Sequence, residues 1–484
     1  MNTRRLSLIP ALLGLCLSAP HAMAGVGQWL RDPLGANPAS LKQGVTLPGD
    51  DAPPDCATDH DPGIPLSLAE AADLALCDNP QVRITWAEIR EQVAGVGEAR
   101  AAYLPTASGS FTYQRDATTY PGQPSLDSTV TGHNIYGSVG WHLFDFGSRA
   151  ANRASANHLL AAALAAHSAE LQNVLDSLIG AWFNAMATKS AVDARREADA
   201  LAKQAVAAAQ RREVGGAGTH SDVLLAEVAS AKATLALSRS QGEYDKARAV
   251  LVYTMGLPPM TEVQLPSLAA TSAAPIGDLD AWMDLAEHSH PELVSAREQW
   301  LAAQQKVRSA RSDGRPTVDF GANLYENGYP NQGLQNLHNQ QFTLGVTVSV
   351  PLFDGFTNHY KVEQAKAAAD VQQAQYEDDQ HKVLMNLVKA HADALASGDN
   401  LQASQNYVEA SEAAVQSAQR RYAGGAASLL ELLTAQTNLA DAHQERVRCL
   451  TDWNTARLRL MASAGQLGLD RLDHPLEMAP KVEK

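Results

Sequence analysis

Long hydrophobic runs are almost absent from this sequence. After the first 24 residues, no stretch approaches the roughly 18 continuous apolar residues that a membrane-spanning helix requires. Aromatic residues make up 6% of the 484 residues and alanine is plentiful, a composition that suits long helices better than a conventional globular core. The net charge of −15 argues against a nucleic-acid partner. Because long apolar runs are missing, any membrane crossing by the chain after residue 24 is expected to use strands.

Motifs for catalysis and for metal or nucleotide binding are also missing. The sequence contains no phosphate-binding glycine loop, no zinc-ligand spacing and no Ser/His/Asp arrangement. Its scattered histidines form no H-x-x-x-H or similar metal-binding pair; they include His158, His167, His381 and His391. We therefore predict a protein that is not an enzyme and that needs no metal or cofactor.

The N-terminus has the pattern of a secretory signal. Arg4 and Arg5 precede an apolar run over residues 6–17, and Ala22-Met23-Ala24 offers a cleavage site. Cys16 could indicate a lipoprotein, but Leu15 stands where a small residue is expected before a lipidated cysteine. The sequence predicts a signal peptide over residues 1–24 and an exported, non-lipidated chain.

Three of the four cysteines lie in the mature chain. In an oxidising compartment, we expect Cys56 and Cys77 to form a disulfide. It would attach residues 25–65, an extended segment rich in proline, glycine and aspartate, to the first helix. Cys449 lies in a helical pattern and is expected to be a lone packed thiol.

A two-residue period of side-chain polarity predicts four strands. Over residues 341–352, apolar residues alternate with polar or small ones, so that one face of the strand would be wholly apolar. The run is about as long as a tilted membrane-crossing strand. Similar alternation predicts strands over residues 106–114, 134–143 and 317–325.

Long helices are predicted after each pair of strands. Residues 149–214 contain no proline and a single glycine, Gly180, and keep an apolar helical stripe. A helix of that length would extend roughly 95 Å. A glycine-rich break over residues 215–218 precedes a second helix over residues 221–255. A shorter helix over residues 67–103 has a break at Asn79-Pro80 and ends before the first strand.

The second half of the chain repeats the first. The equivalent motifs are Asn79-Pro80 and His290-Pro291, Leu143-Phe144-Asp145 and Leu352-Phe353-Asp354, Gln210-Arg211-Arg212 and Gln419-Arg420-Arg421, and Gly256 and Gly465. From the Leu-Phe-Asp motif onward their spacing is constant without a gap. We infer an internal duplication with repeats over residues 66–265 and 266–468, followed by a tail over residues 469–484.

Two strand pairs cannot form a stable open sheet in lipid, because each unpaired backbone group there costs several kcal/mol. The strands are therefore expected to close a barrel shared by several copies of the chain, of eight strands in a dimer or twelve in a trimer. The long helices would then bundle as coiled coils around a water-filled bore. The alternatives are an ordinary half-buried sheet for the strands and a fibrous or adhesive coiled coil for the helices.

These ordered motifs resemble the TolC-like outer-membrane efflux and secretion channels. The resemblance covers nearly all of the mature chain beyond its N-terminal segment, and rests on the doubled helix–strand–strand–helix layout, the Asn-Pro break, the Leu-Phe-Asp strand exits and the Arg-x-x-x-Gly turns. It implies a mainly α fold with a small β part: a homotrimer in which a periplasmic α-barrel continues a shared 12-stranded transmembrane β-barrel.

The resemblance also implies partners and a location. It places the chain in the outer membrane, in contact with its lipid and extending into the periplasm. A periplasmic adaptor would join it to an inner-membrane ABC or proton-driven transporter, and the cargo would be an exported protein or a small molecule. The stretch Cys77-Asp78-Asn79-Pro80-Gln81 and the missing lipidation site are similar to the branch that serves type I secretion of large toxins such as adenylate cyclase-haemolysin.

By the same resemblance, the two helix–helix turns over residues 212–222 and 421–431 would form the periplasmic entrance. Glu431 corresponds to a family acid that lines the constriction, where three copies would form a cation-favouring carboxylate ring. The second family acid is replaced by Thr434. Tyr422 corresponds to a tyrosine that bonds to the first repeat's acid, here Asp222 beside Ser221, but the family's basic partner is replaced by Ala427.

The resemblance further implies that the turn residues dock the adaptor, namely Arg212, Gly215, Gly216, Arg421, Gly424 and Gly425. A simpler interpretation is that Glu431 and Asp222 stabilise helix starts and that the glycines are C-caps. For the whole protein, the alternative to a passive duct is a structural or adhesive envelope protein without transport activity.

Overall fold

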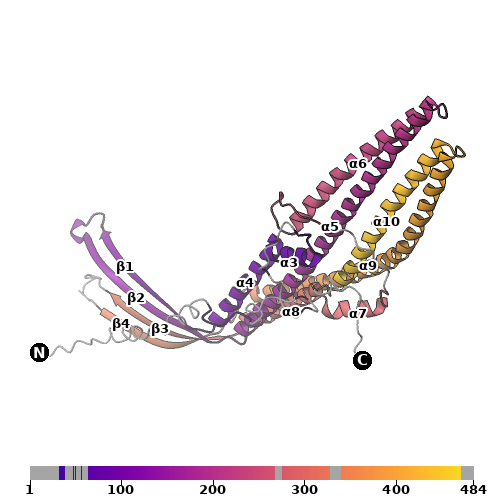
Figure 1. The fold of residues 1–484 in the computed structure, drawn as a ribbon. Helices are drawn as coiled ribbons and strands as arrows, with labels where there is room; N and C mark the ends of the chain where they lie inside the picture. Colours follow the sequence, from indigo (N-terminus) through magenta and orange to yellow (C-terminus); the bar gives the residue numbers. More distant parts are fainter. Residues whose placement is uncertain are drawn as a thin grey trace, which may run out of the picture. The chain divides into compact units, whose positions relative to one another are not determined.

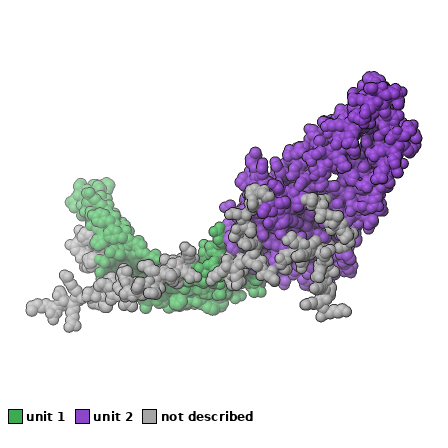
Figure 2. Space-filling view, viewed as in Figure 1, with its two compact units in different colours: residues 1–42, 90–160, 302–368 green, residues 43–89, 161–301, 369–484 purple. Residues whose placement is uncertain are grey.

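The computed structural model describes residues 32–38, 47, 50, 56, 64–266, 275–327, 339–469 and 472. The predicted signal peptide and most of the N-terminal segment over residues 25–65 lie outside this part of the chain. The loop over residues 328–338 and nearly all of the tail over residues 469–484 also lie outside it. The chain divides into two compact units, coloured separately in Figure 2, and each unit takes segments from both repeats.

The two repeats have the same order of α-helices and strands (Figure 1). The first contains α3 (Leu68–Asp78), α4 (Pro80–Ala101), β1 (Thr106–Thr118), the 3₁₀ turn η1 (Pro124–Leu126), β2 (Ser128–Phe144), α5 (Ser148–Val214) and α6 (His220–Thr254). The second contains α7 (Leu279–Ser289), α8 (Pro291–Asp313), β3 (Thr317–Asn327), β4 (Asn339–Ser349), α9 (Thr357–Ala423) and α10 (Leu429–Ser463). Helices α5 and α9 each have 67 residues, and α6 and α10 each have 35. Among the described helices, none combines the length and apolar character of a membrane span.

Most strand ends differ from those that alternation predicts. The β1–β2 hairpin extends to a Thr118–Ser128 pair, beyond the predicted ends at residues 114 and 134. Polar residues break the side-chain alternation between the predicted and observed ends, but backbone hydrogen bonds between the strands do not depend on that alternation. Strand β4 ends at Ser349 rather than residue 352. Pro351, which has no backbone N–H to donate, follows closely.

The four strands form one antiparallel sheet in the order β1-β2-β3-β4. Residues paired in register share a face, so the pairs Phe342–Leu324, Val346–Phe320 and Ala322–Val139 define one apolar face across the strands. The β4 side chains on this face are largely exposed: Phe342 69%, Leu344 61%, Val346 59% and Val348 61%. Among the described residues, no strand pairs with the outer edge of β1 or β4.

The opposite face of the sheet is polar and hydrogen-bonded. Ser108 and Ser138 share a hydrogen bond of 2.7 Å between their hydroxyls, and the Tyr136 hydroxyl donates to the Asn323 side chain at 2.9 Å. His142 on β2 also makes a short contact with Asp319 on β3. The sheet therefore separates an apolar exposed surface from a polar one.

An aspartate starts each long helix and explains the repeated Leu-Phe-Asp motif. The Asp145 carboxylate accepts hydrogen bonds from the backbone N–H of Arg149 at 2.9 Å and from its side-chain Nε at 2.8 Å. In the second repeat, Asp354 accepts from the backbone N–H of Asn358 at 2.7 Å. Each carboxylate satisfies an otherwise unpaired donor in the first helical turn.

The glycine that follows the second long helix of each repeat, Gly256 or Gly465, allows a close approach to the break in that repeat's first helix. A Cβ on Gly256 would lie 2.7 Å from the backbone of Asp78, and one on Gly465 would lie 2.7 Å from the Pro291 ring. Both glycines also have left-handed φ angles, 74° and 70°. This close packing explains why the two X-Pro breaks and the two glycines recur together.

The main hydrophobic core lies in the unit formed by residues 43–89, 161–301 and 369–484. Its fully buried side chains include Trp453, Leu175, Leu178, Ile179, Leu251, Leu387 and Leu458. A disulfide joins Cys56 to Cys77 at the end of α3, with the two Cα atoms 5.5 Å apart. Cys449 is a buried free thiol.

Candidate functional site

The turn between α5 and α6 and the turn between α9 and α10 have the same backbone hydrogen bonds. In the first, the N–H groups of Gly215, Gly216 and Ala217 donate to the carbonyls of Arg211, Glu213 and Arg212, at 3.1, 3.0 and 2.9 Å. In the second, Gly424, Gly425 and Ala426 donate to Arg420, Tyr422 and Arg421, at 3.1, 3.1 and 2.8 Å. These bonds satisfy the last carbonyls of the long helices. The duplication therefore extends to the geometry of both turns.

One glycine in each turn has a backbone conformation that favours glycine. The φ angle is 71° at Gly216 and 72° at Gly425. The preceding glycines, Gly215 and Gly424, have no such angle. Gly216 and Gly425 therefore act at least as C-caps of the long helices.

Alanine at Gly425 should loosen the second turn by about 1 kcal/mol, because a side chain there is forced into the left-handed region. We expect cleavage by trypsin after Arg421 to become about fivefold faster, as the turn opens more often. Gly424→Ala is the matched control, since its Cβ would meet the Arg420 carbonyl at an ordinary 3.5 Å. Equal cleavage rates in the two variants would contradict this interpretation.

The helices after the turns begin with side-chain caps that differ between the repeats. Thr219 and Asp222 form a reciprocal capping box: the Thr219 hydroxyl accepts from the Asp222 N–H, and the Asp222 carboxylate accepts from the Thr219 N–H, both at 3.2 Å. In the second repeat, Ser428 accepts from the Glu431 N–H at 3.2 Å. The described residues show no reciprocal bond from Ser428 to the Glu431 carboxylate. Glu431 is therefore free to face another partner.

An arginine from the last turn of each long helix folds over its own turn. Arg212 donates through Nη2 to the Ala217 carbonyl at 3.3 Å, and Arg421 donates through Nη2 to the Ala426 carbonyl at 3.4 Å. The other ends of the two guanidinium groups bind different partners. Arg421 Nη1 forms an ion pair with Glu431 Oε1 at 2.5 Å. The two equivalent arginines therefore share one carbonyl contact but differ in their second partner.

Arg212 connects the two hairpins. Its Nη1 donates to the Tyr422 carbonyl at 2.7 Å, and its guanidinium carbon lies 4.6 Å from the centre of the Tyr422 ring. The Tyr422 side chain is buried, in a small hydrophobic cluster that also contains Ala209, Val223, Ala226, Ala418, Leu429 and Leu432. This cluster packs side chains from all four long helices, so the two turns form one structural unit within the chain.

The structure brings together some of the predicted site residues and leaves others apart. Asp222 is engaged with Thr219, and no hydrogen bond joins it to Tyr422 among the described residues of this single chain. Within the described chain, the contact between the two hairpins at Tyr422 is made by Arg212 and not by Asp222. Ser221 is exposed, and the exposed Thr434 donates to the Leu430 carbonyl of its own helix at 2.8 Å.

Sequence reasoning missed the contacts of both arginines. By resemblance, Arg212 and Arg421 were expected to dock the adaptor, Asp222 to bond with Tyr422, and Glu431 to form a carboxylate ring across three copies. The signal was present, because a basic pair precedes each glycine turn and an acid follows at the same spacing. Which partner a long, flexible side chain selects cannot be read from that spacing.

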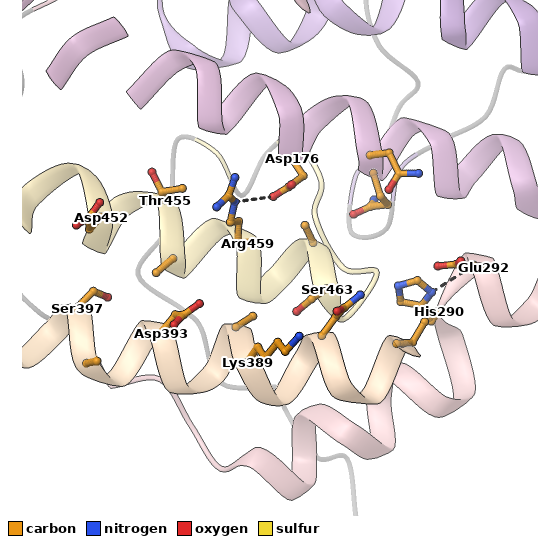
Figure 3. Close-up of a pocket in the computed structure, with 18 of the residues that line it drawn as sticks. Asp176, His290, Glu292, Lys389, Asp393, Ser397, Asp452, Thr455, Arg459 and Ser463 are labelled. Carbon is orange, nitrogen blue, oxygen red and sulfur yellow. Dashed lines mark hydrogen bonds and ion pairs between the residues drawn. The ribbon is translucent and has the colours of Figure 1, made fainter. Parts of the chain in front are cut away.

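The other candidate is a polar cavity of about 590 Å³ lined by residues of α5, α8, α9 and α10 (Figure 3). Asp176 and Arg459 face each other across it in an ion pair of 3.2 Å. Burial lowers the pKa of His290 to about 4 and, together with Asp379, raises the pKa of Glu292. Among the described residues, no group of His, Cys, Asp and Glu could hold a metal ion. We therefore take the helix turns as the candidate functional site.

Comparison with known proteins gives consistent matches over most of the chain. The model of the family described as outer membrane efflux protein matches residues 71–257 and 282–466. Protein CyaE of Bordetella pertussis is 32% identical over 466 residues, which cover 95% of this chain and 96% of CyaE. The alkaline protease secretion protein AprF of Pseudomonas aeruginosa is 25% identical over 424 residues, 83% of this chain and 85% of AprF.

Solved structures share the fold at lower sequence identity. The outer-membrane channel OprN has a TM-score of 0.73 at 20% identity and covers 88% of this chain and 97% of its own. The open state of the Neisseria gonorrhoeae MtrE outer membrane channel has a TM-score of 0.70 at 17% identity, covering 88% of this chain and 99% of its own. These likenesses extend over both repeats.

Proposed function

The chain belongs to the outer membrane efflux protein family, and on this premise we propose that it is the outer-membrane exit duct of a tripartite export system. The observation that carries the proposal is the four-stranded sheet, which has an exposed apolar face, a polar opposite face and two edges that pair with no strand in the described part of the chain. Such a sheet suits a lipid boundary on one side and a water-filled lumen on the other. The chain would reside in the outer membrane and extend into the periplasm.

Closure of the sheet requires further copies of the chain. Backbone groups at the outer edges of β1 and β4 would be left unpaired in hydrocarbon, at several kcal/mol each. Three copies would close a barrel of twelve strands, and the long helices of each copy would continue it as an α-barrel. The helix turns would then form the entrance at its far end, where the Arg212–Tyr422 contact would keep the hairpins together and Glu431 would line the constriction.

We propose type I protein secretion rather than small-molecule efflux as the role. CyaE matches 95% of the chain at 32% identity, and AprF is named for the secretion of alkaline protease. The solvent efflux pump protein SrpC of Pseudomonas putida matches less of the chain than CyaE does, and at lower identity: 25% over 82% of the chain. The cargo would thus be an exported protein, passed on by an inner-membrane transporter through a periplasmic adaptor.

The duct would be passive. The sequence has no nucleotide-binding motif, so opening and transport must take their energy from the transporter. The glycine turns and the arginines beside them would meet the adaptor. This contact would compete with the bonds that tie the two hairpins together and so open the entrance.

Planar-bilayer recording of the purified mature protein tests this proposal against a structural or adhesive role. A duct should give discrete conductance steps, and it should restore secretion in a host that keeps the transporter and adaptor but lacks its own outer-membrane component. A folded oligomer that shows neither conductance nor restored secretion would remove the transport function and favour the adhesive alternative.

A further inference from the structure

We propose that Arg421 is the internal counter-ion of Glu431 and thereby determines the ion selectivity of the entrance. The inference rests on the proposed function and deepens it. A bare glutamate at this position would give a trimer a ring of negative charge. The geometry points instead to a ring in which each carboxylate is already paired within its own chain.

The pair bridges the second turn in a defined geometry. Arg421 Nη1 in the last turn of α9 lies 2.5 Å from Glu431 Oε1 in the first turn of α10. The bond from Arg421 Nη2 to the Ala426 carbonyl holds the guanidinium across the turn. The two side chains remain 54% and 42% exposed, so an ion that reaches this turn meets both charges together.

The first repeat shows what makes this arrangement specific to the second. Arg212 occupies the equivalent position with the same carbonyl anchor, but its acid is Asp222, one methylene shorter than glutamate. The Asp222 carboxylate accepts from the Thr219 N–H at 3.2 Å and from its hydroxyl at 2.9 Å, so it stays in the capping box. The longer Glu431, which receives no such bonds among the described residues, reaches the arginine.

The neighbouring positions supply little other compensation at this turn. Ala427 and Thr434 are uncharged at the two positions where, by the resemblance, the family has a base and an acid. Arg420 is exposed, and its Nε donates to the Gln416 carbonyl of its own helix at 3.3 Å. The described residues show no ion pair for Arg420, which makes it a matched control for the loss of one positive charge per chain.

The test measures the reversal potential in a KCl gradient and the block by hexamminecobalt(III), a trivalent cation. Arg421→Gln should unmask the carboxylates, increase the cation preference and lower the half-blocking concentration about fivefold. Arg420→Gln should change it by less than about twofold, because no acid depends on that side chain. Glu431→Gln should act in the opposite direction, shifting selectivity toward anions and weakening block.

A double-variant cycle separates pairing from a simple change of net charge. In the Glu431→Gln background, Arg421→Gln should no longer strengthen the block. Arg421→Lys should keep the reversal potential and the half-blocking concentration close to those of the original protein. That result would show that the effect of Arg421→Gln comes from lost charge and not from lost folding. Equal effects of Arg421→Gln and Arg420→Gln, or a full Arg421→Gln effect without Glu431, would overturn the inference. Failure of the unaltered protein to conduct would instead overturn the proposed duct.

Discussion

Arginine in place of Val346 should sharply reduce the amount of protein that inserts into the outer membrane. Val346 lies on the apolar face of β4, 59% exposed and paired in register with Phe320. A charge at the bilayer midplane on the lipid side of a barrel costs about 2–4 kcal/mol per chain, and each copy in the ring would bear that cost. We expect at least about a 30-fold fall in inserted protein, measured by density fractionation of outer membranes.

The next residue provides the control for that experiment. Thr347 lies on the polar face of the same strand, directly opposite Asp319 in the register. An arginine there faces the proposed lumen and an acidic neighbour, so Thr347→Arg should insert like the original protein. Equal insertion of the two variants, or failure of the Thr347 variant alone, would contradict the assignment of the two faces.

Arg212→Gln should open the entrance of the channel. The substitution removes the 2.7 Å bond to the Tyr422 carbonyl and the stacking of the guanidinium on the Tyr422 ring. A charged hydrogen bond and a cation–π contact together contribute about 2–3 kcal/mol, which corresponds to roughly a 30- to 150-fold shift toward the open state. Single-channel recording should show this shift as a larger open fraction or a higher conductance.

Two further variants sharpen the test of this latch. Arg211→Gln removes the same charge from an exposed neighbour with no side-chain hydrogen bond among the described residues, and should leave the entrance closed. Tyr422→Phe keeps the ring and the carbonyl and should also stay closed. If Arg212→Gln left the open fraction and the conductance unchanged, or if Arg211→Gln raised them equally, the contact would not hold the hairpins together.

Local patterns were enough to predict the fold class and the family. The Leu-Phe-Asp and glycine motifs recur at constant spacing because each has a local task, such as the Asp145 cap or the close packing at Gly256. The family match over both repeats and the structural likeness to OprN confirm the mainly helical, duplicated fold. The match to the outer membrane efflux protein family, and the relative AprF that is named for secretion, support the resemblance first indicated by those motifs.

The contacts of the candidate site could not be read from the sequence. Asp222 and Glu431 occupy equivalent positions, but one extra methylene allows Glu431 to reach Arg421 while Asp222 stays with Thr219. Strand ends such as Thr118 and Ser128 were likewise missed, because backbone pairing continues after side-chain alternation has stopped. Both features depend on three-dimensional contacts rather than on periodicity.

Native mass spectrometry of the mature protein in mild detergent tests the central claim most directly. If the sheet is one third of a shared barrel, folded protein should appear as trimers, and dissociation into single chains should coincide with loss of sheet signal in circular dichroism. A stable single chain that retains its full sheet content would contradict the account.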